Sequence, residues 1–220
     1  MENKSISRAV IKRLPRYYRY LGDLIQQGVD KISSKALSEM MGVTASQIRQ
    51  DLNNFGGFGQ QGYGYNVKYL FNEIGKILNL HEKHYVIIIG AGNLGWAIAN
   101  YTDFGKRGFV IAGIFDTNPN LVGEIINGLE IRSLNDLETF ISDKKAEGID
   151  IEIATLTVPR DNAIEVANKV VDAGIEAIWN FAPVDLHLPS KILVKNVHLT
   201  ASLMQLSYNL SERKKSDKNK

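Results

Sequence analysis

Apolar residues follow two different rhythms along the chain. Up to about residue 80 they recur three or four positions apart, which is the spacing of one face of an α-helix. From residue 85, short continuous apolar runs alternate with amphipathic stretches, a rhythm typical of buried parallel strands joined by helices. The pattern predicts a helical domain followed by a doubly wound α/β domain. We expect strands at 85–90, 109–116, 151–156 and 175–181, and helices at 7–27, 34–41, from 44, and at 67–80, 91–104, 136–147 and 161–173.

The N-terminal helices have the order and spacing of a helix-turn-helix. Within 7–27 we expect two short helices, with Pro15 in the first turn of the second. Gly42 ends the next helix in the left-handed conformation, and after a tight turn Thr44 opens a third helix. Thr44 and Gln47 form a capping-box pattern, in which each side chain can bond a backbone donor at the helix start.

Two faces of the third helix follow from the advance of about 100° per residue. One face is apolar and must point to the core; it comprises Ala45, Ile48 and Leu52. The other is polar and carries side chains that match the hydrogen-bonding edges of DNA bases. It comprises Ser46, Arg49, Gln50 and Asn53. The pattern predicts a DNA-recognition helix, with an ordinary solvated face as the alternative.

Residues 55–66, FGGFGQQGYGYN, combine glycines and aromatics without any charge. A Gly-rich β-hairpin fits this composition. Placed after a recognition helix, the hairpin resembles the wing of a winged-helix domain, whose tip, near Gly62 and Tyr63, would approach the DNA. The alternative is a strained loop with Tyr63 and Tyr65 packed inward.

A glycine motif follows the first strand of the α/β domain and opens a helix, which is the context that a dinucleotide-binding loop requires. The loop comprises Gly90, Ala91, Gly92, Asn93, Leu94 and Gly95. Gly90 permits the turn, Gly92 admits a pyrophosphate, and Gly95 allows close helix–strand packing. Asp116 ends the second strand, where its carboxylate can bind the adenosine ribose and repel the 2′-phosphate of NADP. The alternative for Asp116 is a cap or turn residue in the sequence DTNP.

Two more loops follow predicted strands, at the sheet edge where open α/β sheets bind ligands. We expect them on the nicotinamide side of an NAD site; they comprise Thr157, Val158 and Pro159, and Asn180, Phe181, Ala182 and Pro183. No second domain remains to hold a substrate, and none of the four histidines has a convincing acid–base setting. A catalytic site is therefore not expected. The alternatives are a small NAD-dependent oxidoreductase and a CoA-binding module, and Asp116 argues against CoA.

Composition narrows the setting. The chain has no cysteine, which excludes disulfides and thiolate metal sites and fits a reducing cytoplasm, and we expect no metal site. No apolar run is long enough for a membrane span. The net charge of +2 is uneven: residues 1–80 have 11 basic and 6 acidic side chains, whereas residues 81–210 have 10 and 16. A basic front half fits a polyanionic partner.

A last helix is predicted at 196–212, with leucines spaced four, three and four residues apart at Leu199, Leu203, Leu206 and Leu210. Such a stripe needs an apolar partner, either its own sheet or a second copy of the chain. The charged tail after it, 211–220, is expected to be disordered. The predicted divisions are thus 1–80 for DNA binding, 81–198 for NAD(H) binding and 199–220 for the terminal helix and tail.

Taken together, the motifs RLPRYYRYL, GVTASQIRQDLNNFGGFGQQGYGYNV, VIIIGAGNLGWAIANY, IFDTNP, TVPR, WNFAP and NVHLTASLMQLSYNL resemble the Rex family of redox-sensing transcriptional repressors over nearly the whole chain. The resemblance implies a homodimer with N-terminal winged helices, NAD-binding Rossmann domains and an exchanged C-terminal helix. It further implies that NADH releases the protein from operator DNA, while NAD⁺ competes weakly or supports DNA binding.

The resemblance also assigns residues. Ser46, Gln47, Arg49 and Gln50 match the recognition-helix contacts, and Arg16 and Tyr17 match residues on the phosphate side. Two departures stand out. The wing has Gln60 and Gln61 where the family usually has basic residues, and the terminal helix begins with His198 and Thr200 where the family often has an acidic residue.

Overall fold

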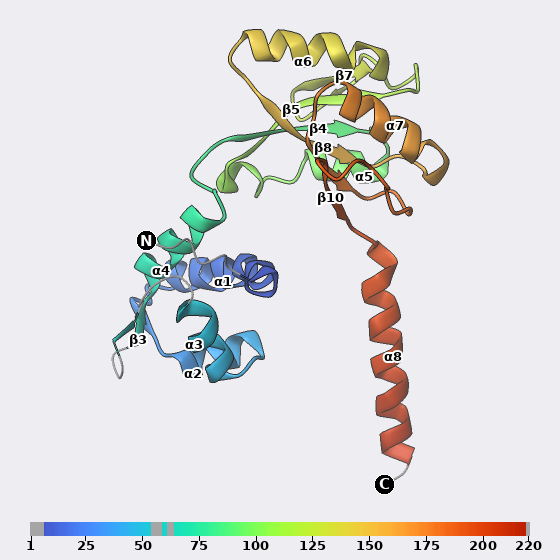
Figure 1. Cartoon of the computed structure of the whole chain (residues 1–220). Helices are drawn as coiled ribbons and strands as arrows, with labels where there is room; N and C mark the ends of the chain where they lie inside the picture. Colours follow the sequence, from blue (N-terminus) through green and yellow to red (C-terminus); the bar gives the residue numbers. More distant parts are fainter. Residues whose placement is uncertain (1–6, 54–58, 61–63, 219–220) are drawn as a thin grey trace. The chain divides into compact units, whose positions relative to one another are not determined.

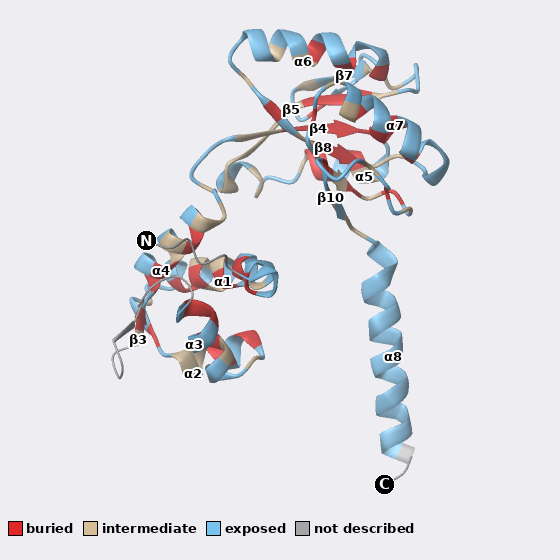
Figure 2. Ribbon diagram, viewed as in Figure 1, coloured by how far each residue is buried: buried red, intermediate tan, exposed pale blue. Residues whose placement is uncertain are grey.

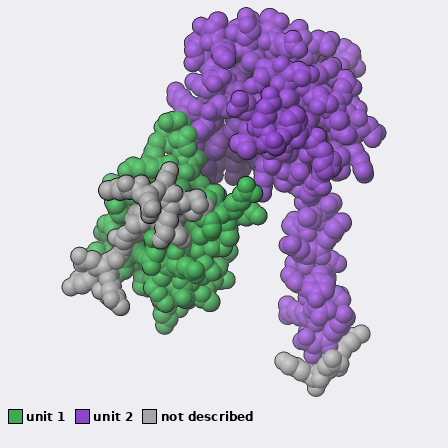
Figure 3. Space-filling view, in the orientation of Figure 1, with its two compact units in different colours: residues 1–82 green, residues 83–220 purple. Residues whose placement is uncertain are grey.

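A computed structural model of the chain describes residues 7–53, 59–60 and 64–218. It divides into two compact units, residues 1–82 and 83–220, coloured separately in Figure 3. The boundary predicted from the sequence lay between residues 80 and 81, and the terminal helix, predicted as a separate segment, belongs to the second unit.

The first unit has the fold of a winged helix-turn-helix (Figure 1). Its three strands form an antiparallel sheet in the order β1-β3-β2, so that the Gly-rich segment is a hairpin, as predicted. Fourteen buried apolar residues from the helices and this sheet form its core, with Leu14, Leu37, Ile48 and Leu70 among those without any exposed surface. The elements are α1 (Arg8–Gln26), β1 (Lys31–Ile32), α2 (Ser34–Met41), α3 (Ala45–Asn53), β2 (Gly59–Gln60), β3 (Gly64–Asn66) and α4 (Val67–Ile77).

One helix, α1, replaces the two short helices expected around Pro15. Proline removes the hydrogen bond to the carbonyl four residues earlier, which here belongs to Ile11. Both Pro15 and Ile11 are exposed, so water can solvate that carbonyl and the helix continues. The helix-turn-helix itself is as predicted: α2 covers 34–41, and Gly42 closes it with φ +62°.

The second unit is a doubly wound sheet of the Rossmann type. Six parallel strands lie in the order β10-β9-β8-β4-β5-β7, and β6 pairs antiparallel to β7 at the edge. The order reverses at β4, so the ligand crevice is expected where β4 and β8 end. The elements are β4 (His84–Ile89), α5 (Asn93–Ala99), η1 (Gly105–Arg107), β5 (Phe109–Asp116), β6 (Ile125–Ile126), β7 (Leu129–Ser133), η2 (Leu134–Asp136), α6 (Leu137–Ala146), β8 (Ile151–Leu156), α7 (Arg160–Asp172), β9 (Ala177–Asn180), β10 (Leu193–Asn196) and α8 (Leu199–Lys218).

The two faces of this sheet carry separate apolar clusters. Ile87 and Ile89 belong to the cluster that includes residues of α6 and α7, whereas Ile88 belongs to the cluster of α5. Because side chains alternate along a strand, a continuous apolar run such as HYVIII supplies both faces. The sequence did not predict β7 or β10, and α5 ends at Ala99 rather than near Phe104.

Helix α8 is exposed from Leu199 to Asp217 (Figure 2). The disorder predicted for the tail is wrong up to Lys218, because the helix continues through it and is supported by a Lys215–Glu212 ion pair of 2.8 Å. Within residues 7–53, 59–60 and 64–218, no helix is long and apolar enough to cross a membrane.

Candidate functional site

The glycine loop between β4 and α5 leaves no room for side chains at two positions. Gly90 has φ +104°, and a Cβ there would lie 2.8 Å from the carbonyl oxygen of Thr157. A Cβ at Gly95 would lie 1.8 Å from the carbonyl oxygen of Gly90. By contrast, a Cβ at Gly92 would meet nothing within 4 Å, so the space beside Gly92 is open to a ligand. The steric requirements predicted for Gly90 and Gly95 are thus confirmed, and the pyrophosphate contact at Gly92 stays a prediction.

Asp116, at the end of β5, reaches across to this loop. Its Oδ2 accepts a hydrogen bond of 2.6 Å from the backbone N–H of Ala91, and its Oδ1 accepts one of 2.8 Å from the N–H of Asn118. The second bond is the turn contact considered as an alternative, and the first bond places the carboxylate beside the glycine loop. Asp116 therefore stabilises its own turn and also lines the ligand crevice.

A cavity of about 520 Å³ opens at the carboxyl ends of β4, β5 and β8, where the strand order predicts a ligand. Eight of the predicted cofactor residues line this cavity: Gly90, Gly92, Leu94, Asp116, Thr157, Val158, Pro159 and Phe181. The hydroxyl of Thr157 lies 2.7 Å from the carbonyl oxygen of Gly90 and 3.1 Å from that of Ile89. Thr157 therefore holds the glycine loop in place, which is a role that the sequence did not reveal.

Six of the predicted cofactor residues are not part of the cavity lining: Ala91, Asn93, Gly95, Asn180, Ala182 and Pro183. Asn93 begins α5, and Ala91 takes part through its N–H to Asp116. Ala182 is buried and Pro183 is exposed, both outside the lining. Other lining residues, which sequence reasoning missed, are Ile89, Thr117, Asn118, Leu121, Leu134, Asn162 and Val166. Thr117 and Asn118 directly follow Asp116, so their position after a strand was the available signal.

Asn180, which was expected in the loop on the nicotinamide side, does not turn its side chain into the cavity. Asn180 has no exposed surface, and its Nδ2 donates to the carbonyl oxygen of Val184 at 2.7 Å and to Oδ1 of Asn196 at 2.9 Å. Its Oδ1 accepts from the N–H of Ala182 at 3.0 Å. All of these bonds shape the loop after β9 and attach it to β10. Asn180 is therefore a structural residue, because its amide satisfies a buried turn.

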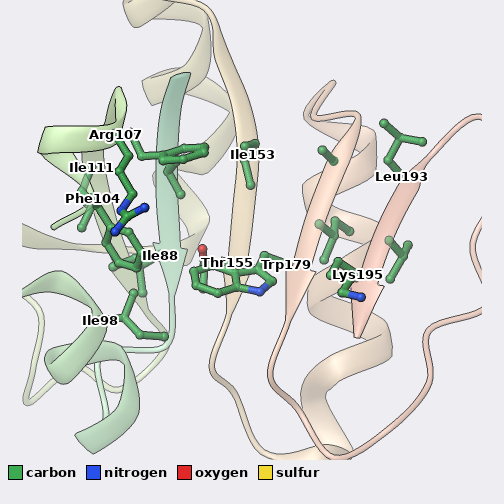
Figure 4. A pocket seen from close by; sticks show the side chains of 15 residues that line it. Ile88, Ile98, Phe104, Arg107, Ile111, Ile153, Thr155, Trp179, Leu193 and Lys195 are labelled. Carbon is green, nitrogen blue, oxygen red and sulfur yellow. The ribbon is translucent and has the colours of Figure 1, made fainter. Parts of the chain in front are cut away.

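A second cavity, of about 490 Å³, lies over β8, β9 and β10 on the side of the sheet that α5 occupies (Figure 4). Its lining is almost wholly apolar and includes Ile88, Ile153 and Trp179. Thr155 lies in the same wall without exposed surface, and in the described part of the chain its hydroxyl has no hydrogen-bond partner. This face of the sheet is thus apolar over β8, β9 and β10. Among the described residues that line the cavity, only Ile98 of α5 and Arg107 of η1 belong to helices.

A row of aromatic rings joins the two cavities. Phe181 lines the first cavity, and its ring centroid lies 4.5 Å from that of Trp179 in the second. Trp179 in turn lies 5.8 Å from Phe104, and both pairs are edge-to-face. The Phe181 ring is therefore in direct contact with a residue of the second cavity's wall.

In the first unit, α3 presents the predicted polar face. Ser46, Arg49, Gln50 and Asn53 are exposed, whereas Ile48 and Leu52 are buried. Thr44 caps the helix, since its hydroxyl accepts from the N–H of Gln47 at 3.1 Å. The reciprocal half of the expected capping box is absent, because the Gln47 side chain binds Asp51 instead. The Arg49 guanidinium donates to the Ser34 hydroxyl at 3.2 Å, on α2.

Asp51 is a buried carboxylate that the sequence did not single out. It has no exposed surface and accepts hydrogen bonds from Arg13, Tyr17 and Gln47. Burial is the largest influence on its pKa and raises it, but these hydrogen bonds together outweigh burial and hold the pKa of Asp51 below its ordinary value. The pKa of Tyr17 is raised by burial and then by its bond to Asp51.

The phosphate-side role expected for Tyr17 is therefore wrong, because this side chain is fully buried with its hydroxyl on Asp51. Arg16 is exposed and donates to the backbone carbonyl of Met41 at the end of α2. Gly62 and Tyr63 lie outside the described residues. Tyr65 is buried, which agrees with the alternative in which this residue packs inward.

In the described ranges, no cluster of three or more histidine, aspartate or glutamate side chains could hold a metal.

Comparisons with known proteins place both units. Residues 5–53 match the family described as "Putative DNA-binding protein N-terminus", and residues 81–184 match the family described as "CoA binding domain". The chain is 55% identical over 212 residues to the redox-sensing transcriptional repressor Rex of Clostridioides difficile (strain 630), covering 96% of this chain and 99% of that protein. It is 56% identical over 213 residues to Rex of Thermoanaerobacter sp. (strain X514), covering 96% and 93%.

The chain belongs to the Rex family of redox-sensing transcriptional repressors. Solved structures agree: RSP, a Rex-family repressor, shares 52% identity with a TM-score of 0.87, covering 98% of this chain and 99% of that one. RSP in complex with β-NADH matches with 52% identity and a TM-score of 0.88, over 99% and 100%. RSP in complex with β-NAD⁺ and operator DNA matches with 55% identity and a TM-score of 0.87, over 98% and 97%.

The Rex relatives are named as repressors, not as enzymes. Residues 81–184, which match the CoA-binding description, contain the sheet and the crevice of the second unit. In this Rex-family chain, Asp116 lines the crevice beside the glycine loop.

Proposed function

We propose that this chain is an NADH-responsive transcriptional repressor that binds operator DNA as a homodimer and leaves it when NADH binds. One observation carries the proposal: a winged helix with an exposed polar recognition face and a dinucleotide crevice occur in a single chain. Solved relatives of more than 50% identity were crystallised with NADH, and with NAD⁺ and operator DNA. Such a protein acts where DNA and the nucleotide pool meet, in the cytoplasm.

The crevice fits NAD(H). The open space beside Gly92 admits a pyrophosphate, and the carboxylate of Asp116 would accept hydrogen bonds from the adenosine ribose. The same negative charge would repel the 2′-phosphate of NADPH. Val158, Pro159 and Phe181 line the rest of the cavity and would contact the nicotinamide side. When bound, the cofactor serves as the signal, because its redox state reports that of the cell.

On the DNA side, the exposed face of α3 would read bases in the major groove. Arg49 is the strongest candidate, because its guanidinium is exposed and can donate two parallel hydrogen bonds to guanine. Ser46, Gln50 and Asn53 share the exposed face, and Thr44 at the helix start and Arg16 near the end of α2 would lie on the phosphate side. The described residues contain no other element with such a face beside a hairpin.

Dimerisation follows from two apolar surfaces. Helix α8 exposes Leu199, Leu203, Leu206 and Leu210 to between 51% and 64%. The α5 side of β8, β9 and β10 holds an apolar cavity. If α8 of a second copy covered this cavity, both apolar surfaces would be removed from water. The burial would be favourable by about 25 cal/mol per Å² of apolar area. The exchanged helix would then join two DNA-binding units.

The aromatic row supplies a route for the signal. Phe181 lines the cofactor crevice and packs on Trp179, which lines the face proposed for the partner's helix. A cofactor that stabilises one arrangement of Phe181 would therefore stabilise one arrangement of the dimer. A ligand can shift such an equilibrium only through its different affinity for the two states.

The experiment is a DNA shift assay on the upstream regions of the gene, with and without NADH. We expect a retarded complex that NADH dissolves, at concentrations where NADPH has little effect. Arg49→Ala should lose sequence-specific binding while NADH affinity stays intact, because Arg49 lies in the other unit. Operator affinity that saturating NADH leaves unchanged would refute the proposal. Turnover of a substrate in a hydride-transfer assay would instead favour a small NAD-dependent oxidoreductase. Tighter binding of CoA than of NADH would favour a CoA-binding module.

A further inference from the structure

The buried carboxylate of Asp51 is connected to the recognition helix through the side chain of Gln47. Arg13 binds it with two hydrogen bonds of 2.7 Å, from Nε to Oδ2 and from Nη2 to Oδ1. The hydroxyl of Tyr17 donates to Oδ2 at 2.9 Å. The fourth donor is Nε2 of Gln47, at 2.7 Å from Oδ1. Gln47 lies one turn before Asp51 on α3 and is partly exposed, next to Ser46 on the polar face.

This bond determines which way round the Gln47 amide lies. The oxygen and nitrogen of an amide look alike by shape and are told apart by their partners. An ionised carboxylate can only accept hydrogen bonds, so the atom facing Asp51 must be the nitrogen. The carboxylate stays ionised at neutral pH because Arg13 and the other donors hold the pKa of Asp51 low against the effect of burial. The carbonyl oxygen Oε1 then diverges from the carboxylate.

Arg13 and Tyr17 keep the carboxylate from rotating. Both belong to α1, 38 and 34 residues away in the sequence, and both are donors to a group without exposed surface. With Oδ1 and Oδ2 each bound twice, Asp51 cannot turn to follow a moving Gln47. The inward position of the amide nitrogen is thus set before any DNA arrives.

We propose that Asp51 is a positioning residue for base recognition, which holds Gln47 with its amide nitrogen inward so that its carbonyl oxygen reads an amino group in the major groove. The inference rests on the proposed operator binding and deepens it. In the major groove, adenine offers the N6 amino group and cytosine the N4 amino group, whereas guanine and thymine offer acceptors at O6 and O4. Gln47 therefore selects adenine or cytosine at its base position and disfavours guanine and thymine.

The test is selection of binding sites from a randomised duplex library by the full-length protein and its variants. The wild type should select adenine or cytosine at one position of each half-site. Gln47→Leu should accept all four bases there, with roughly tenfold weaker binding to the original site. Gln50→Leu serves as the matched comparison on the same helix and should relax a different position.

Two variants separate orientation from mere stability. In Asp51→Asn, the new amide can keep its oxygen on Nε of Arg13 and the Tyr17 hydroxyl, lose the bond from Nη2 of Arg13, and donate to Oε1 of Gln47, which turns the Gln47 nitrogen outward. The preference should then move toward guanine or thymine. Gln47→Glu, which can only accept and whose carboxylate Asp51 repels, should point outward and keep the preference for an amino group, so it tests acceptor recognition if Asp51→Asn does not fold. Thermal melting of each variant shows that it is folded.

Three results would overturn the inference. The first is a wild-type preference for guanine or thymine at the position that Gln47→Leu relaxes. The second is unchanged selection by Gln47→Leu, and the third is loss of the amino-group preference in a folded Gln47→Glu variant. Failure of the operator proposal looks different, because then the wild type itself would select no sequence.

Discussion

At the scale of single residues, Asp116 combines two tasks that are separable by chemistry. Its two oxygens accept from Ala91 and Asn118, which fixes the turn after β5 against the glycine loop. Its charge is what distinguishes a free ribose from a ribose phosphate. An uncharged isostere such as asparagine can accept only one of these two hydrogen bonds, so it weakens the first task and loses the second.

We therefore expect Asp116→Asn to narrow the preference for NADH over NADPH while NADH binding falls only moderately. Asp116→Ala should lose both, with NADH affinity lower by roughly ten- to a hundredfold, since hydrogen bonds to charged groups contribute about 1.5–3 kcal/mol. Titration of each variant with NADH and NADPH measures this. If both variants kept the preference for NADH over NADPH, the role of Asp116 would be restricted to stabilising the turn after β5.

The Asp51 cluster makes the first unit sensitive to acid. Because the folded-state pKa of Asp51 lies below its unfolded value, the stability it adds is complete above about pH 4 and is lost as the pH falls through the folded-state pKa. Arg13→Ala leaves a buried carboxylate without its ion pair and should cost on the order of 3 kcal/mol, the lower end for buried pairs, because Arg13 is 31% exposed. Hydrogen exchange of the α3 amides between pH 3 and 7 tests both statements. Equal protection in the variant and wild type at neutral pH would contradict them.

Residues with a steric requirement could be predicted from the sequence, and buried polar residues could not. The glycine motif demands Gly90 and Gly95 wherever it occurs, and the structure has no room for side chains there. Asp51 and Asn180 are polar types that are usually exposed, and their burial depends on partners far along the chain, such as Arg13 and Asn196. Tyr17 was expected to be accessible for the same reason, because the sequence does not show that its partner is the buried Asp51.

At the scale of elements, long periodic segments were predictable and short edge strands were not. β5 and β8 coincide with the predicted ranges 109–116 and 151–156, because continuous apolar runs are needed at the sheet centre. β7 and β10 lie toward the edges and carry alternating exposed residues, which leaves little signal in four or five positions. Helix α8 was predicted from the spacing of its leucines, and its residues 199–217 are exposed.

Removing residues 199–220 should give monomers that can retain NADH but lose tight operator binding. The leucines of α8 lie inside this segment, and the cofactor crevice lies outside it. Removing only 211–220 is the matched control, because it deletes charged turns and keeps all four leucines. Sedimentation equilibrium reads the oligomeric state. A dimeric, NADH-responsive protein without 199–220 would assign dimerisation to another surface.

At the scale of the whole molecule, the two sites lie in separate units, so cofactor and DNA can influence each other only through the arrangement of the assembly. Two recognition helices must be about 34–36 Å apart to enter successive major grooves. A modest rotation of one subunit is therefore enough to weaken DNA binding.

Coupling of this kind must be reciprocal. If NADH lowers operator affinity by some factor, operator must lower NADH affinity by the same factor, typically about 5- to 150-fold. Isothermal titration with NADH, with and without saturating operator, gives the change in NADH affinity. The DNA shift assay with and without NADH gives the change in operator affinity, and the two factors are compared. Phe181→Leu should reduce both equally, because it removes the ring that packs on Trp179. Unequal factors in the wild type would show that a further equilibrium intervenes.

The placing of the tryptophans has an optical consequence. The chain has two, Trp96 on α5, 56% exposed beside the glycine loop, and Trp179 in the wall of the apolar cavity. Both belong to the second unit, so ultraviolet excitation of indole reports on this unit alone. Reduced nicotinamide absorbs where indole emits and oxidised nicotinamide does not, so we expect bound NADH to quench this emission and to emit by energy transfer, and we expect covering of Trp179 by a partner to shift the emission to the blue. A single fluorescence spectrum of the unlabelled protein would then record cofactor redox state and subunit association as separate changes.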